Sequence, residues 1–128
     1  MSVFSHVTLG YDDVAKAKAF YNDVLKPLGL ASTTETDTLS VYSDGAGGPL
    51  FIVLKPSNGQ PASVGNGLTV AFLAPSRAAV DDFHKRALAN GAKDEGAPGP
   101  RSFAPNAYAA YFRDTGGHKI CAYCYKPE

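Results

Sequence analysis

The 128-residue sequence predicts one α+β domain, residues 1–128, made of two βαβββ modules at 1–62 and 63–128. Three observations predict this fold: an internal repeat, one amphipathic helix in each half, and a strand–turn–strand pattern that ends each half. Half of the chain could hardly bury both a sheet face and a helix face by itself. We therefore expect the modules to pack edge to edge into a curved mixed sheet, with the helices on one face and a concave cleft on the other.

The repeat consists of two pairs of similar segments. HVTLGYDDVAKAKAFYNDVL begins at His6 and TVAFLAPSRAAVDDFHKRAL begins at Thr69, an offset of 69 − 6 = 63 positions. VYSDGAGGPLFIVL begins at Val41 and YFRDTGGHKICAYC begins at Tyr111, an offset of 111 − 41 = 70 positions. Segments that recur in the same order at a nearly constant spacing indicate a structural unit used twice.

The first module shows a strand, a helix and three further strands. Residues 3–10 are rich in β-branched and aromatic side chains and predict the first strand. Asp12 and Asp13 can cap the helix that follows, whose apolar residues recur at helical spacing from Val14 to Leu28. The further strands are expected at 31–35, 38–43 and 50–55.

The second module repeats this order. Residues 67–73 predict its first strand, Ser76 can cap its helix, and Gly91 suits the left-handed position after the helix. Residues 96–106 predict a loop because they are rich in glycine and proline. The remaining strands are expected at 93–96, 107–113 and 119–125.

Composition argues against several classes of partner. Lys plus Arg and Asp plus Glu both number 12, so the basic surplus typical of nucleic-acid and anionic-membrane binding is missing. No apolar run approaches the roughly 20 residues of a membrane helix, and the first residues lack a signal-peptide pattern, so we expect a cytoplasmic protein. Cys121 and Cys124 fall in a predicted strand, where positions i and i+3 face opposite ways, and are expected to be free, packed thiols.

Three segments resemble the vicinal oxygen chelate superfamily, the group of glyoxalases, bleomycin-resistance proteins and extradiol dioxygenases. They are HVTLGYDDVAKAKAFYNDVLKPLGL from His6, NGLTVAFLAPSRAAVDDFHKRAL from Asn66 and PGPRSFAPNAYAAYFRDTGGHKICAY from Pro98. The resemblance implies paired βαβββ modules and a homodimer, with a cleft formed within one chain or between two. It does not fix the reaction, because one fold serves many functions.

In metal-dependent members of that superfamily, four strands each supply one ligand to a divalent ion, usually in the order His, Glu, His, Glu. The resemblance maps three of these positions to His6, Thr69 and Cys121, and the offset of 70 adds Phe51. Phe51 cannot ligate a metal, Thr69 is a poor neutral ligand, and Cys121 ligates only as a thiolate. We therefore expect no divalent metal cofactor, while a zinc or copper adduct of His6 and Cys121 stays open.

Alternation along the strands predicts which other side chains share the cleft. The expected ligand-binding residues are His6, Thr8, Phe51, Thr69, Arg101, Tyr111, Cys121 and Tyr123. A largely apolar and aromatic lining with a few polar groups is typical of a small-molecule pocket. Each of these residues also has a structural alternative: a hydrogen-bonded histidine on a half-buried strand, a solvated loop arginine, or tyrosines that fill a sheet face.

Other residues offer little chemistry. His84 lies on the second helix and is expected to pack there or face solvent, while His118 lies beside a hairpin turn and is expected to be solvated. A nucleophilic Cys121 would need a neighbouring base, and the sequence places none beside it, so no catalytic residue is assigned.

The sequence thus predicts a glyoxalase-like protein that binds a small, anionic or aromatic molecule in its cleft without the usual metal centre. Two alternatives stay open: a metal-dependent lyase of the lactoylglutathione lyase type with ligands from other positions, and a non-catalytic interaction module. An open cleft lined by His6, Tyr111 and Tyr123 favours small-molecule binding. A cleft plugged by Phe51 and the tyrosines favours the interaction module.

Overall fold

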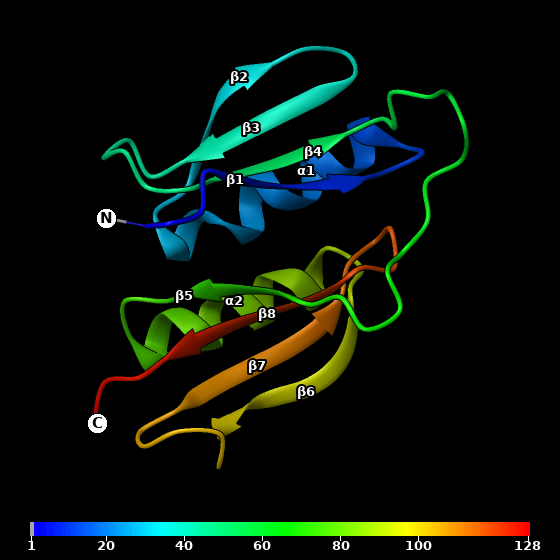
Figure 1. Ribbon diagram of the computed structural model, residues 1–128. Coiled ribbons are helices and arrows are strands. Elements are labelled where there is room, and N and C mark those ends of the chain that lie inside the picture. Colours follow the sequence, from blue (N-terminus) through cyan, green and yellow to red (C-terminus); the bar gives the residue numbers. More distant parts are fainter. Residues whose placement is uncertain (1) are drawn as a thin grey trace.

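A computed structural model describes residues 2–128 and confirms the α+β prediction, with two α-helices and two four-stranded mixed sheets (Figure 1). The strands of the first sheet are β1 (His6–Gly10), β2 (Ala31–Glu35), β3 (Leu39–Ser43) and β4 (Leu50–Leu54). Those of the second are β5 (Val70–Leu73), β6 (Lys93–Pro100), β7 (Tyr108–Arg113) and β8 (Lys119–Cys124). The strand orders are β1-β4-β3-β2 and β5-β8-β7-β6, so the two sheets repeat one topology.

Both helices begin where the sequence predicts. The Asp13 carboxylate accepts the Lys16 N–H at the start of α1 (Val14–Val24), and the Ser76 hydroxyl accepts the Ala79 N–H at the start of α2 (Arg77–Ala89). A short 3₁₀ turn, η1 (Lys26–Leu28), follows α1. Gly29 ends η1 with a φ of 75°, a conformation that glycine adopts without a steric penalty.

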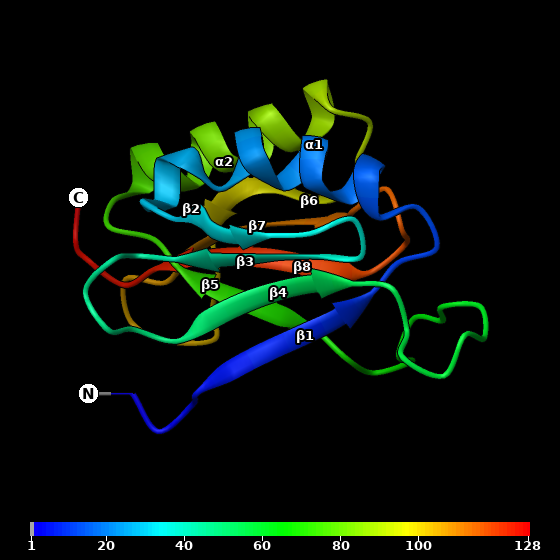
Figure 2. The same ribbon diagram turned by 90° about the horizontal axis from the view of Figure 1, so that it is seen from above.

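A single core joins the two modules. The helices lie side by side over the same side of both sheets (Figure 2). Phe20 of α1 lies 5.8 Å from Phe112 of β7, and Phe51 of β4 lies 5.1 Å from Phe72 of β5, between ring centroids. Both aromatic pairs cross from one module to the other, so the two modules share the main core.

Each sheet has a helix face, which packs on the helices, and an open face on its other side. In β1, Val7 and Leu9 belong to the core, so the alternating residues His6 and Thr8 lie on the open face. No strand of one sheet is hydrogen-bonded to the other sheet within residues 2–128, so the continuous sheet of the prediction is divided in two. Because the sheets meet through their helix faces, their open faces point outward in different directions (Figures 1 and 2).

A buried carboxylate ties the modules together at one end. Asp114, which is 5% exposed in the β7–β8 turn, accepts hydrogen bonds from the hydroxyls of Tyr11 at 2.5 Å and Tyr21 at 2.6 Å. Its other oxygen accepts the backbone N–H groups of Gly116 at 2.9 Å and His118 at 3.0 Å. Burial, together with this carboxylate, raises the pKa of both tyrosines, so the phenols stay protonated and act as donors.

The predicted loop at 96–106 is shorter than expected. Strand β6 continues to Pro100 and pairs with β7 through two irregularities in register, near Gly96 and Gly99. Glycines at such bulges are compatible with strand pairing, which a count of glycine and proline alone cannot reveal. Neither α-helix in the described part of the chain is long and apolar enough to cross a membrane.

Candidate functional site

The predicted site residues fall into two groups on different sheets. His6 and Thr8 lie on the open face of the first sheet, and Thr69 lies exposed just before β5. Tyr111, Cys121 and Tyr123 lie on the open face of the second sheet, in a small cluster separate from the main core. His6 is exposed, and its Nδ1 lies 2.9 Å from the Ser5 hydroxyl.

The placement of Phe51 in the cleft is wrong. Phe51 is 3% exposed and packs against Tyr21 of α1 on the helix face, with ring centroids 4.9 Å apart. The neighbouring Ile52 occupies the open face instead, because parallel pairing sets Thr8 opposite Ile52 just as it sets Ala71 opposite Cys121.

The cause of this error is a difference in hairpin length. Tyr42 pairs with Phe51 in the first module and Phe112 pairs with Ile120 in the second, so the first connection spans nine positions and the second spans eight. The offset between the repeats is therefore 70 from β3 to β7, but only 69 from β4 to β8. A slip of one residue moves a side chain to the opposite face of a sheet.

The corrected set of four positions does not fit a divalent metal. The set becomes His6, Ile52, Thr69 and Cys121, and Ile52 is no more able to ligate than Phe51. His6 and Cys121, the two side chains with suitable donor atoms, lie on the open faces of different sheets. Within residues 2–128 no group of three or more His, Cys, Asp or Glu side chains is placed to hold a metal ion.

The open face of the second sheet instead carries a compact aromatic cluster. Tyr111 and Tyr123 pack edge to face with ring centroids 5.9 Å apart, and their hydroxyls are hydrogen-bonded to each other. Cys121 lies opposite Tyr111 and two positions before Tyr123 on β8, and it is 1% exposed. Phe103, in the loop after β6, places its ring 5.9 Å from that of Tyr123 and partly covers the cluster.

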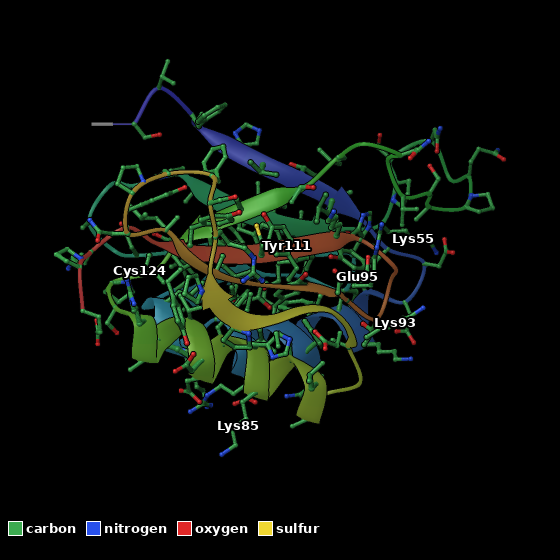
Figure 3. All side chains as sticks on the ribbon, turned by 90° about the horizontal axis from the view of Figure 1, so that it is seen from below. Lys55, Lys85, Lys93, Glu95, Tyr111 and Cys124 are labelled. Carbon is green, nitrogen blue, oxygen red and sulfur yellow. The ribbon has the colours of Figure 1, made fainter. Side chains whose placement is uncertain are left out.

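Two cations flank this cluster. The Arg101 guanidinium lies 5.7 Å from the centre of the Tyr111 ring, and the Lys119 ammonium lies 5.4 Å from it (Tyr111 is labelled in Figure 3). Lys119 escaped the sequence prediction, although alternation along β8 would have placed it on the same face as Cys121 and Tyr123.

Arg101 is held more firmly than a solvated loop residue. Its guanidinium donates hydrogen bonds to the carbonyls of Ala97, Gly99 and Pro100, at 3.0, 2.9 and 3.2 Å. The arginine therefore fixes the path of the chain after β6 while its charge stays beside Tyr111.

His118 is buried rather than solvated. It is 5% exposed, and its Nε2 lies 2.8 Å from the carbonyl oxygen of Gly10 at the end of β1. His84 packs on α2 as expected, 6% exposed, with its Nε2 2.9 Å from Asp94. An isolated hairpin turn is solvated, but the β7–β8 turn that carries His118 packs against the first module. This contact joins residues far apart in the chain, so the local sequence around His118 does not reveal it.

The Cys121 thiol stays protonated at neutral pH. Burial raises the pKa of its thiol to about 11, and the Tyr111 hydroxyl, Lys119 and Arg101 only partly oppose this effect. Since the thiolate is both the nucleophile and the metal ligand, the thiol is poorly suited to either role.

We expect iodoacetamide at pH 8 to alkylate Cys121 roughly 100-fold more slowly in the folded protein than in urea, because the thiolate fraction falls about tenfold per pKa unit. Peptide mass spectrometry over time follows Cys121 and Cys124 separately. Equal rates in folded and unfolded protein would contradict the burial of this thiol.

Comparisons with known proteins agree with this architecture. The family model described as Glyoxalase/Bleomycin resistance protein/Dioxygenase superfamily matches residues 3–122. A crystal structure of a glyoxalase/bleomycin resistance protein from Albidiferax ferrireducens T118 is 39% identical, with a TM-score of 0.86 over 98% of this chain and 100% of that one. A comparison with curated proteins finds no match.

Two more distant structures share the fold. A glyoxalase-related enzyme from Fulvimarina pelagi is 18% identical, with a TM-score of 0.74 over 97% of this chain and 88% of that one. Lactoylglutathione lyase from Agrobacterium tumefaciens is 24% identical, with a TM-score of 0.68 over 97% and 94%. Because the family model matches nearly the whole length of this chain, the chain belongs to the glyoxalase/bleomycin resistance protein/dioxygenase superfamily.

Proposed function

We propose that this protein binds a small organic anion on the open face of its second sheet, without the four-ligand metal centre of its metal-dependent relatives. The observation that carries the proposal is the pair of cations around Tyr111. Neither Arg101 nor Lys119 forms a salt bridge with a carboxylate of the described residues, so both charges are available to a ligand.

An anion with a planar apolar part suits this surface best. The half-buried ring of Tyr111 supplies apolar area, and whichever hydroxyl accepts the Tyr111–Tyr123 hydrogen bond keeps its own hydrogen to donate to a carboxylate. Burial raises the pKa of Tyr111, which keeps its hydroxyl a donor at neutral pH. A ligand must displace the ring of Phe103 from Tyr123. Phe103 is 75% exposed, so few packing contacts are lost when its ring moves.

The donor atoms also support binding without a metal. A catalytic zinc site normally has three protein ligands, and hard cations prefer several oxygens. The corrected positions offer one imidazole and one thiol whose pKa is raised to about 11. The alternative of a metal-dependent lyase would need ligands from elsewhere in the chain.

Lys119→Met is expected to weaken carboxylate binding about tenfold, because it removes one charge-assisted interaction worth about 1.4 kcal/mol. The measurement is an amide NMR titration with pyruvate, succinate, benzoate and salicylate, read at Tyr111, Cys121 and Tyr123. Lys85→Met is the matched control, since Lys85 extends into solvent from α2 (Figure 3).

Equal affinities of the two variants would contradict the proposed role of Lys119. Repeating the titration with added zinc or nickel separates the alternatives. Binding that requires the metal would favour the lyase, and no binding in either condition would favour an interaction module.

We further propose that a second copy of the chain completes the site. The open face of the first sheet carries a set of half-buried aliphatic side chains: Leu39, Val41, Leu50, Ile52 and Leu54. An apolar sheet face of this kind is usually covered. A two-fold pair of chains that sets this face against the aromatic cluster of its partner would bring His6 of one copy near Cys121 of the other.

Ile52→Asp is expected to convert a dimer into a monomer, because it places a charge on the apolar face that the second copy would cover. Light scattering after size exclusion, at micromolar concentration, measures the mass. Ala78→Asp, on an exposed position of α2, is the control and should stay dimeric. A wild-type monomer at these concentrations would reject the dimer.

A further inference from the structure

A cavity of about 320 Å³ lies where the two modules meet, apart from the aromatic cluster. Its walls come from three segments distant in sequence: the turn from β1 into α1, the linker around 62–64, and the β7–β8 turn. Its volume falls within the range of roughly 300–1,000 Å³ that is typical of small-molecule sites. No residue of the proposed anion site lines it.

The walls nearest α1 are held by hydrogen bonds between aspartate side chains and backbone N–H groups. The Asp12 carboxylate accepts the Ala62 N–H at 2.7 Å, which joins the linker to the start of α1. The Asp13 carboxylate accepts the Lys16 N–H at 3.0 Å and caps the helix. Each carboxylate uses one oxygen in these bonds, so each keeps a second oxygen for another partner.

The opposite wall is equally fixed. A Cβ on Gly116 would lie 2.7 Å from the ring of Tyr11, so only glycine allows the β7–β8 turn to come this close. His118 lies against Tyr11 with ring centroids 4.9 Å apart and is anchored through Nε2 to the carbonyl oxygen of Gly10. Because a carbonyl only accepts, Nε2 must donate, which leaves Nδ1 as an acceptor in the neutral ring.

Charged groups of both signs therefore line one preformed cavity. Asp12 and Asp13 supply negative charge, and the ammonium of Lys16 forms no salt bridge within the described residues. The hydroxyls of Ser63 and Thr115 add polar groups that can donate or accept. Asp12, Asp13 and Lys16 are exposed, so a ligand with a single charge can pair with only one sign of charge here, whereas a ligand with both charges can pair with both.

We infer that this junction cavity is a second ligand site, suited to a small zwitterion of the α-amino-acid type. The ammonium of the ligand lies toward Asp12 and Asp13, and its carboxylate lies toward Lys16. The remaining volume accommodates a side chain of modest size beside Val64 and Thr115.

The test uses the full chain and the twenty free amino acids as probes in an amide NMR titration. At least one amino acid is expected to give saturable shifts at Lys16, Val64 and Thr115. Its decarboxylated amine and its N-acetyl derivative are each expected to bind about tenfold more weakly, because each lacks one of the two charges.

Variants give a second measurement. Lys16→Met is expected to weaken binding of the amino acid about tenfold relative to its amine, while Lys85→Met leaves the affinity unchanged. Absence of saturable shifts with all twenty amino acids would overturn the inference, as would equal binding of an amino acid and its two derivatives. Shifts at Tyr111 and Cys121 report on the anion site instead, so the two proposals fail separately.

Discussion

Asp114→Ala is expected to lower the free energy of unfolding by about 3–5 kcal/mol. The substitution leaves the buried hydroxyls of Tyr11 and Tyr21 without their acceptor and frees two backbone N–H groups of the β7–β8 turn. A buried polar group that loses its partner costs about 1–3 kcal/mol, and two phenols lose theirs here. Urea denaturation at pH 7 measures the change through the midpoint and slope of the transition.

Asp44→Ala is the matched control for this measurement. Asp44 is the repeat-related aspartate of the first module and accepts the N–H groups of Ala46 and Gly48 in its own turn, but it is exposed. Its replacement by alanine removes hydrogen bonds within the turn but leaves no buried polar group without a partner. We therefore expect a much smaller loss in the free energy of unfolding. Similar losses in the two variants would mean that the tyrosine hydroxyls contribute little.

Phe51→Ala is expected to cost about 3–5 kcal/mol of stability, the usual loss when a buried aromatic ring is removed and a cavity remains. The ring of Phe51 lies between Tyr21 of α1 and Phe72 of β5, so its removal loosens contacts within and between the modules. The same denaturation experiment measures this change.

Phe4→Ala provides the same chemical change at an exposed position. Phe4 is 69% exposed and precedes β1, so we expect a change below about 0.5 kcal/mol. Comparable losses at the two positions would show that Phe51 does not lie on the helix face, and would restore the sequence-based placement.

Sequence patterns predicted the local elements well because short-range rules determine them. The caps at Asp13 and Ser76 and the strand β2 (Ala31–Glu35) all follow from propensity, spacing and the repeat. These features depend on neighbours a few residues away, which any single sequence displays.

Long-range features were predicted less well, for physical reasons. One extra residue in the first hairpin turned Phe51 toward the helices, and contact with the other module buried His118. The division into two sheets depends on whether the edge strands β1 and β5 pair, and edge pairing leaves no clear trace in composition. Lys119 was missed for a similar reason: alternation along β8 indicates its face, but its position beside the Tyr111 ring depends on the pairing of β7 with β8.

The division into two sheets has a consequence for how the molecule loses its structure. Among residues 2–128 no strand pairing connects the repeats, yet both contribute to one main apolar core, and Asp114 links them by hydrogen bonds at one end. Melting of either repeat would expose the interior of the other. We therefore expect the two repeats to unfold as one cooperative unit, so that slow amide exchange in both repeats reports the same global opening.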